Sequence, residues 1–184
     1  MTDRPPYTPS AAYGAEVTKE GSRWTLALVR TYRHPIERVW EAITDPAHLR
    51  EWAPFDATAG LGTTGATVRL TTVGAPVPQV EETVVVRAEA PTLLEYQWGG
   101  HPMRWELEPM GAGTRLKLWT SIPKNYIAMG AAGWHICLDA MDRHLAGAPI
   151  GRMVGMDALK FDGWHRLNAE YAAMFGIGSV VPKW

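Results

Sequence analysis

The stretch YIAMGAAGWHICLDAMDRHL, residues 126–145, decides the fold predicted for this chain. Asp139 and Arg143 fall on one side of the helix that it predicts, and Gly147 and Pro149 are stop signals after its last turn. At 3.6 residues per turn, the opposite side carries a single, mostly apolar stripe, which consists of Ile127, Gly130, Trp134, Leu138, Met141 and Leu145. A stripe of this width needs a large apolar partner, which we expect to be a sheet formed by the middle of the chain.

The strands of that sheet are predicted from alternating segments upstream of the helix. Residues 24–32 are the first strand candidate, and further candidates follow at residues 66–73, 79–89, 93–98, 102–108 and 114–121. Short connections rich in glycine and proline separate most of them, which is typical of an antiparallel meander. In the last three segments apolar and charged side chains alternate, so we expect one face to cover the long helix and the other to be wet.

Two short helices are predicted between the first strand and the meander. The first begins at Pro35, because proline suits the first turn of a helix. The second begins at Pro46, with Asp45 as its cap, and it carries Leu49 and Trp52.

The predicted organisation is one domain with two tails. Residues 1–21 show no period and hold three prolines, so we expect a flexible N-terminal arm. Residues 22–147 form the domain. Residues 148–184 form a C-terminal extension with a short helix packed on the domain, in which helical spacing relates Trp164, Leu167, Tyr171 and Phe175.

The composition indicates an ordinary globular protein and excludes several classes of partner. The chain has 184 residues, a hydrophobic fraction of 46% and a formal net charge of -1, so nothing favours nucleic acid or an anionic membrane surface. The chain holds no apolar run of roughly 18 residues that could span a bilayer, and its N-terminus lacks the apolar core of a signal peptide. With Cys137 as the single cysteine, we expect a cytoplasmic protein.

Three segments carry a resemblance to a known family: LVRTYRHPIERVWEAITDPAHLREWAPF (28–55), GTRLKLWTSI (113–122) and GWHICLDAMDRHL (133–145). With the order of strand, two short helices, antiparallel strands and long helix, they resemble the SRPBCC (START/Bet v-like) superfamily. More narrowly, they are similar to its activator-of-heat-shock-protein-90-ATPase homologue-like branch. The resemblance implies an α+β helix-grip fold, in which a curved antiparallel β-sheet wraps around a long C-terminal α-helix.

The motifs that could indicate a catalytic or cofactor site do not stand in the context that such a site needs. Residues 60–65 match G-x-G-x-x-G, but a helix precedes them and a strand follows, which is the reverse of a dinucleotide site. His135 and Asp139 have the i, i+4 spacing of metal ligands without a third ligand, so we expect a surface hydrogen bond. Cys137 is predicted to be a buried, inert thiol. We therefore expect no metal, no cofactor and no catalytic constellation.

The resemblance implies that hydrophobic or aromatic small molecules bind between sheet and helix. We therefore predict a hydrophobic cavity there. The alternative is that the same side chains fill the core. Tyr96, Thr120, Arg30 and His101 are the polar groups expected to reach the ligand. The predicted ligand-binding residues are Trp52, Phe55, Tyr96, Trp98, Met103, Trp105, Leu118, Thr120, Trp134, Leu138 and Met141.

Three functions remain open at this point. The first is binding of a hydrophobic, aromatic or polyketide-like small molecule. The second is a polyketide cyclase or aromatase that uses the same cavity, with Tyr96 or His101 assisting proton transfer. The third is a co-chaperone-like interaction protein. Trp184 and the C-terminal segment would also allow a homodimer.

Overall fold

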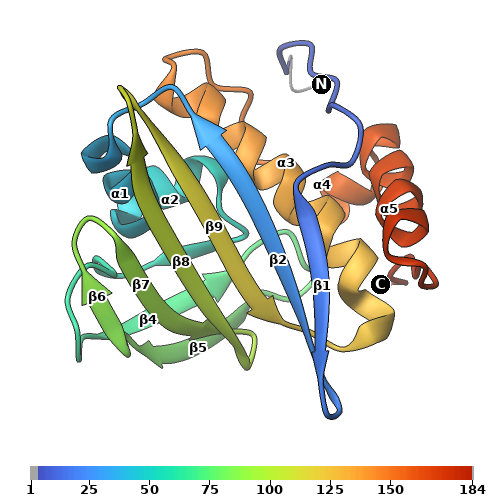
Figure 1. Cartoon of the computed structure of the whole chain (residues 1–184), viewed down its shortest axis with the longest axis horizontal. Coiled ribbons are helices and arrows are strands. Elements are labelled where there is room, and N and C mark those ends of the chain that lie inside the picture. The colour runs from blue at the N-terminus through green and yellow to red at the C-terminus, as the bar shows by residue number, and fades with distance from the viewer. Residues whose placement is uncertain (1–3, 184) are drawn as a thin grey trace.

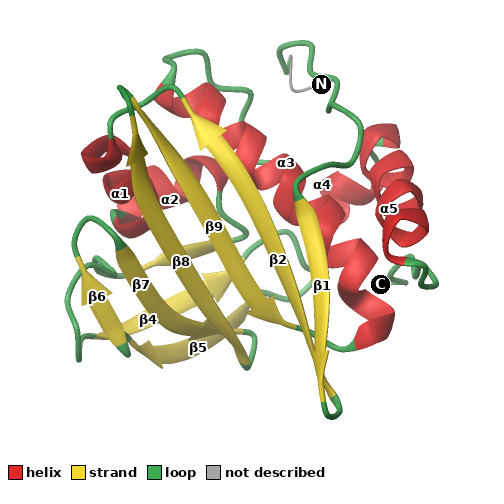
Figure 2. Cartoon of the chain, viewed as in Figure 1, coloured by secondary structure: helices red, strands yellow, loops and turns green. Residues whose placement is uncertain are grey.

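The computed structural model describes residues 4–183; residues 1–3 of the expected arm and Trp184 of the expected extension lie outside it. A six-stranded antiparallel sheet forms one layer, and the helices lie behind it (Figures 1 and 2). Its strands, in spatial order, are β1 (Ala15–Glu20), β2 (Arg23–Tyr32), β9 (Gly113–Ser121), β8 (His101–Met110), β7 (Leu93–Trp98) and β6 (Arg87–Glu89). The sheet is open, and with the long helix against it the predicted α+β helix-grip fold is confirmed.

The long helix predicted from residues 126–145 is α3 (Ile127–Leu145), which follows the short 3-10 helix η1 (Lys124–Tyr126). It is buried on more sides than its apolar stripe, because α5 (Asp162–Phe175) packs along a second side of it (Figure 1). The second side carries alanines that are fully buried, such as Ala128 and Ala132, and small side chains of this kind allow two helices to approach closely. The C-terminal helix α5 thus packs against α3 in this structure.

A second, three-stranded sheet lies beside the first, and it changes one predicted strand. It consists of β3 (Phe55–Ala57), β4 (Thr67–Thr72) and β5 (Gln79–Val84). Residues 79–89 were expected to form one strand, but they divide into β5 and β6, which belong to different sheets. Between them the backbone N–H of Val85 donates to Ala66 and that of Val86 donates to Glu95, so the chain crosses from one sheet to the other here.

The two predicted short helices are α1 (Ile36–Thr44) and α2 (Pro46–Trp52). The Asp45 side chain caps α2 by accepting a hydrogen bond of 2.8 Å from the backbone N–H of Ala47, as predicted. The C-terminal extension also contains the short helix α4 (Met156–Leu159), which precedes α5.

The N-terminal segment contains a strand and packs on the domain, where the sequence suggested no regular structure. Residues 15–20 pair with β2 along their full length as β1. Before them, the Tyr7 hydroxyl donates to Asp139 of α3, and the backbone N–H of Ala12 donates to Glu170 of α5 at 2.8 Å. The sequence did not predict this strand, because β1 is only six residues long and most of its side chains are exposed. Such a segment shows no clear alternation of apolar and polar residues.

A buried polar network holds this segment between β2 and α5. Arg30, which is 3% exposed, donates to the carbonyl of Tyr13 at 3.1 Å and to the hydroxyl of Tyr171 at 3.1 Å. His135 is fully buried and shares a hydrogen bond of 2.8 Å with the same hydroxyl, so its expected place at the surface is wrong. Arg30 therefore supports the packing of the termini and is not a contact for a ligand.

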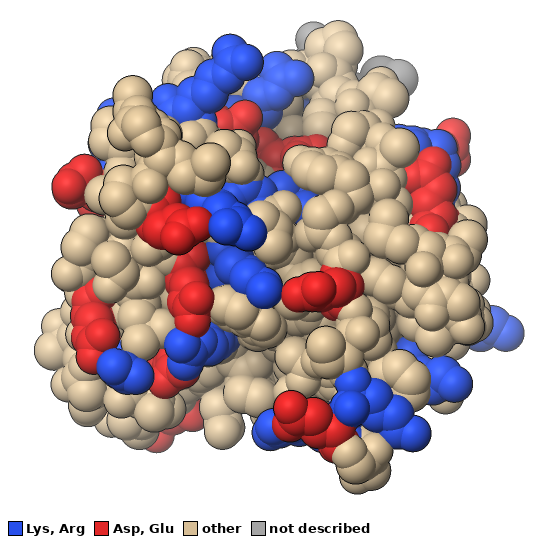
Figure 3. All heavy atoms as spheres, in the orientation of Figure 1, with Lys and Arg blue, Asp and Glu red and all other residues tan. Residues whose placement is uncertain are grey.

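The outer face of the six-stranded sheet is charged, as the alternation predicted. Figure 3 shows Lys and Arg interspersed with Asp and Glu over the strands. Arg104 of β8 pairs with Glu106 on the same strand and with Glu95 on the neighbouring strand β7, and Arg115 of β9 pairs with Glu108 of β8 at 3.0 Å. Because the charges are locally paired, this face does not form a field of a single sign. None of the helices within residues 4–183 is long and apolar enough to cross a membrane.

Candidate ligand-binding site

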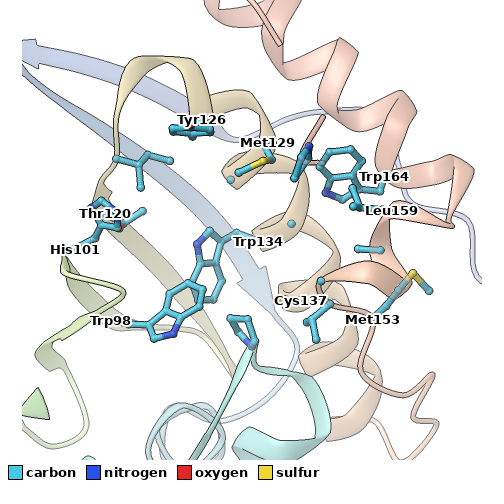
Figure 4. Close-up of a pocket in the computed structure, with 18 of the residues that line it drawn as sticks. Trp98, His101, Thr120, Tyr126, Met129, Trp134, Cys137, Met153, Leu159 and Trp164 are labelled. Carbon is cyan, nitrogen blue, oxygen red and sulfur yellow. The ribbon is translucent and has the colours of Figure 1, made fainter. Parts of the chain in front are cut away.

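A cavity of about 500 Å³ lies where one end of the six-stranded sheet meets α3 and the C-terminal extension (Figure 4). Trp98 and Trp134 lie on one side of it, and Met153, Leu159 and Trp164 lie on the other. The cavity is thus bounded by three parts of the chain that are distant in sequence: the sheet, the long helix and the extension.

A tight hairpin places two sheet residues at the cavity. Trp98 at the end of β7 is the register partner of His101 at the start of β8. Gly99 and Gly100 between them have φ of 61° and 74°, the left-handed values that a two-residue hairpin turn needs at both positions. Residues with a side chain adopt this conformation at a cost, so the two glycines fix the turn that presents Trp98 and His101 to the cavity.

Two glycines of α3 leave space for the cavity on the side of the helix. Gly130 and Gly133 both line the cavity, although glycine inside a helix costs about 1 kcal/mol relative to alanine. A Cβ atom at Gly130 would lie 2.8 Å from the side chain of Ile122, so this glycine accommodates a neighbour. A Cβ atom at Gly133 would meet nothing within 4 Å. The empty space therefore reaches the backbone of α3 at Gly133, where a side chain could project freely into it.

The opposite side is formed by residues 153–159, which we call the C-terminal wall. The wall is held against the loop after β4 by direct backbone contact, because the N–H of Met156 donates to the carbonyl of Gly74 at 2.9 Å. Gly155 has φ of 56°, and a Cβ atom there would lie 2.2 Å from the Gly74 oxygen. Just before the wall, Arg152 forms an ion pair of 2.9 Å with Asp56 of β3. Both contacts tie the wall to the three-stranded sheet.

The tryptophans of the cavity continue an aromatic cluster that comes from the core. The ring of Trp134 lies 5.8 Å from that of Trp98 and 5.7 Å from that of Trp105, both in edge-to-face geometry. Trp105 in turn contacts Trp52 at 6.0 Å. The indole N–H of Trp98 donates to the Thr72 hydroxyl at 2.9 Å, which fixes the orientation of its ring. The cavity thus has rigid aromatic surfaces on its inner side.

The lining is apolar and carries no formal charge. Among the described residues that line it there is no Lys, Arg, Asp or Glu, and the polar side chains include Thr120, His101 and Tyr126. Moving an ion from water into such surroundings without a partner is costly, whereas an apolar molecule gains by leaving water. The site therefore suits a neutral ligand. Within residues 4–183, no group of three or more His, Cys, Asp and Glu is placed to hold a metal ion.

The family model "Activator of Hsp90 ATPase homolog 1-like protein" matches residues 33–146, which is more than half of the chain. The chain belongs to this family. Trp98, Thr120 and Trp134 fall within the matched region, whereas the C-terminal wall and Trp164 lie beyond it. One side of the cavity is therefore built from the family domain and the other from the extension.

Solved structures share the fold. A conserved protein of unknown function from Enterococcus faecalis is 17% identical with a TM-score of 0.66, and the match covers 87% of this chain and 89% of that one. CalU16 from Micromonospora echinospora is 19% identical with a TM-score of 0.62, covering 91% and 96%. DynU16, from the dynemicin biosynthetic locus, is 26% identical with a TM-score of 0.60, covering 69% and 49%. No curated protein matches the chain in sequence.

Of the eleven residues that the sequence predicted to bind the ligand, the cavity lining includes Trp98, Thr120 and Trp134. The other eight fill the core of the protein. Trp52 and Phe55, two of these eight residues, are both fully buried. The space between the middle of the sheet and α3 is close-packed by the side chains that were expected to surround a ligand. These core residues, each between 0% and 2% exposed, are Trp52, Phe55, Tyr96, Met103, Trp105, Leu118, Leu138 and Met141.

Two of the expected polar groups are also placed elsewhere. The hydroxyl of Tyr96 accepts a hydrogen bond of 3.2 Å from the indole N–H of Trp105, and burial raises the pKa of Tyr96 well above its usual value. Tyr96 is therefore a satisfied core hydroxyl and does not line the cavity, and Arg30 belongs to the network of the termini. Thr120 and His101 are the two expected polar groups that line the cavity.

The sequence did not predict that the C-terminal wall, or Gly130 and Gly133 of α3, would line the cavity. Gly130 and Gly133 were visible as two glycines three residues apart inside a helix, which is an unfavourable choice unless space is needed. The wall carried no such signal, because residues 146–162 show no period from which their position against the sheet could be inferred.

Cys137 also lines the cavity, and we expect its thiol to be unreactive. Burial raises its pKa to about 12, so almost no thiolate forms near neutral pH. At pH 8.5 iodoacetamide should alkylate the folded protein roughly a thousandfold more slowly than the unfolded one, whose thiol has a pKa of about 8.5. Mass spectrometry of timed samples measures both rates. Equal rates would mean that the thiol is ionised in the fold.

The same shift makes folding sensitive to alkaline pH. Because the folded pKa is higher than the unfolded one, the contribution of Cys137 to stability is full below about pH 8.5 and is lost as the pH rises towards 12. The difference between wild type and Cys137→Ala in the free energy of unfolding should therefore shrink over this range, as urea titrations at successive pH values can show.

Proposed function

We propose that the cavity binds a neutral, hydrophobic, aromatic small molecule of polyketide-like character. The observation that carries the proposal is an apolar cavity, without a charged lining residue, whose inner side is formed by Trp98 and Trp134 and whose outer side includes Trp164. Its volume of about 500 Å³ is within the range of roughly 300 to 1,000 Å³ found for small-molecule sites.

The arrangement of the rings favours a flat ligand over a flexible chain. The edge-to-face pair of Trp98 and Trp134 presents both a ring face and a ring edge, the two surfaces against which another aromatic ring packs favourably. Thr120 and His101 could supply hydrogen bonds to a ring substituent. The likeness to DynU16, from the dynemicin biosynthetic locus, supports testing polycyclic aromatic compounds first.

The binding test uses one ring system in two charge states. We expect 1,8-dihydroxyanthraquinone, which is neutral at pH 6.5, to quench tryptophan fluorescence and raise the melting temperature, because binding to the folded state alone stabilises it. The anion anthraquinone-2-sulfonate should bind at least about tenfold more weakly, because the cavity offers its sulfonate no partner. Equal affinity for both compounds, or no response to either, would contradict the proposal.

Substitutions at Gly133 provide the matched variants. Leucine there should project into the cavity and weaken binding of 1,8-dihydroxyanthraquinone by roughly tenfold or more, since nothing within 4 Å would hold its side chain elsewhere. Alanine adds one methyl group and should leave most of the affinity. If Gly133→Leu binds as tightly as wild type, the ligand lies outside this cavity.

The same pair tests whether the glycine is retained at the expense of stability. Gly133→Ala should raise the free energy of unfolding by about 0.5–1 kcal/mol, because alanine favours the helix and meets no neighbour. Urea denaturation measures the change. A loss of stability would show that the space at Gly133 is smaller than the geometry indicates.

A second candidate, the cyclase function, is favoured by one observation: His101 lines the cavity. An imidazole there could accept or donate a proton while the cavity holds a folded substrate. Tyr96 is excluded from this role by its position in the core. Loss of turnover of an aromatic polyketide precursor in His101→Gln, with unchanged binding, would support the enzyme, whereas unchanged turnover would assign His101 to binding.

A further inference from the structure

The outward face of the small sheet carries valines where a solvated face is usually polar. Val80 and Val84 of β5 are 58% and 52% exposed. We call the outward surface that carries Val80 and Val84 the valine face. The opposite face of the same sheet is well buried, as Val68 and Leu70 of β4 show. Both faces of this sheet are therefore partly apolar, which is unusual for a sheet with one face open to solvent.

The register of β4 and β5 gives this face a definite charge pattern. Arg69 lies opposite Glu82, and on either side of this pair Thr71 lies opposite Val80 and Thr67 opposite Val84. Arg69 and Glu82 form an exposed ion pair of 3.6 Å. The face thus consists of one row of opposite charges between two rows that each hold a threonine and a valine.

We infer that a second copy of this chain covers the valine face, in a symmetric dimer with the two small sheets face to face. Two orientations of a twofold axis in the plane of such an interface keep the strands of the two sheets aligned, one parallel and one perpendicular to the strands. The parallel axis places β4 of one protomer over β5 of its partner at the same level along the strand. Arg69 then lies over Glu82 of the partner subunit, and each valine lies over a threonine of the partner subunit.

The perpendicular axis would place Arg69 over Arg69 of the partner subunit, which like-charge repulsion disfavours. The charge pattern of the valine face therefore complements itself when the axis is parallel to the strands. A twofold dimer requires such self-complementarity, because both protomers contribute the same surface to the interface. An unrelated partner would need a matching pattern of its own, whereas a second copy already carries it. Stacked sheets pack about 10 Å apart, so the rows of threonine and valine from the two protomers would come into contact.

The experiment measures the mass of the full chain by sedimentation velocity over a concentration series. We expect a dimer whose dissociation constant rises by roughly tenfold or more in Val84→Glu and in each single reversal, Arg69→Glu and Glu82→Arg. The double reversal restores opposite charges across the axis, so the dimer should return. All of these side chains are exposed, and circular dichroism confirms that each variant is folded.

Val181→Glu is the matched control, because Val181 is 47% exposed but lies in the C-terminal segment. It should leave the dimer intact. The inference is overturned if the wild type is monomeric at every concentration, if Val84→Glu does not change its mass, or if Val181→Glu dissociates it while Val84→Glu does not. The last outcome would place the interface at the C-terminal segment.

Discussion

Replacing Trp105 with alanine is expected to lower the free energy of unfolding by about 3–5 kcal/mol, the largest stability effect of any single change considered for this protein. Trp105 is 1% exposed and contacts the rings of both Trp52 and Trp134. Its removal would leave a cavity in the middle of the helix–sheet interface and an unpaired hydroxyl at Tyr96. Guanidinium chloride denaturation with the same slope for both proteins measures the difference.

Trp119 provides the matched control, because it stands on the neighbouring strand but on the outer face of the sheet. Its Cα pairs with that of Arg104, and its ring lies under the ammonium group of Lys117 at 4.5 Å. Alanine at this position should cost only about 1 kcal/mol, the scale of an exposed cation–π contact. If Trp105→Ala instead abolished ligand binding and left stability unchanged, Trp105 would belong to the cavity, as the sequence suggested, and not to the core.

Replacing Gly155 with alanine is expected to detach the C-terminal wall from the body of the protein. The new Cβ atom would collide with the backbone oxygen of Gly74, and that oxygen is not at the end of a flexible side chain that could move aside. Backbone strain at positive φ and loss of the hydrogen bond from Met156 to Gly74 should together cost about 2–4 kcal/mol. Affinity for 1,8-dihydroxyanthraquinone should fall by roughly tenfold or more, because one side of the cavity is no longer held in place.

Gly151→Ala is the control that distinguishes the effect of backbone strain at positive φ from the effect of a steric clash. Gly151 also has positive φ, at 78°, but a Cβ atom there would meet nothing within 4 Å. This variant should lose only about 1 kcal/mol and keep its affinity. Thermal unfolding and ligand titration of the two variants give the comparison. Equal behaviour would show that the wall is held by other contacts, such as the ion pair of Arg152 with Asp56.

The regular elements were predictable where the physical cause is local. Asp45 caps α2 because its carboxylate reaches a backbone N–H two residues on, and Pro46 fits the first turn whatever the rest of the chain does. Likewise, alternation along β7, β8 and β9 determines which side chains share a face, and the apolar stripe of α3 determines which side meets them. The order of these elements, together with the three segments that resemble the family, was enough to place the chain in its family and fold.

The site could not be located in the same way. The predicted aromatic residues do face one another between sheet and helix, but their summed volume fills that space, as Tyr96 and Trp105 show. The cavity lies instead at the end of the sheet, because Gly133 has no side chain to fill the space between α3 and the C-terminal wall. The strand at residues 79–89 was also misread, because its change of sheet at Val85 depends on hydrogen bonds to distant strands.

The sequence alone thus determined the elements and their faces, since caps, turns and hydrophobic periods act over a few neighbouring residues, and its resemblance to a known family implied the helix-grip fold. Only the tertiary structure decided which apolar side chains are core and which border a cavity. That distinction depends on the volume left between Trp98, Gly133 and Leu159, which come from three segments far apart in the chain. No local pattern encodes such a volume, because it is the difference between the space that the backbones enclose and the side chains that enter it.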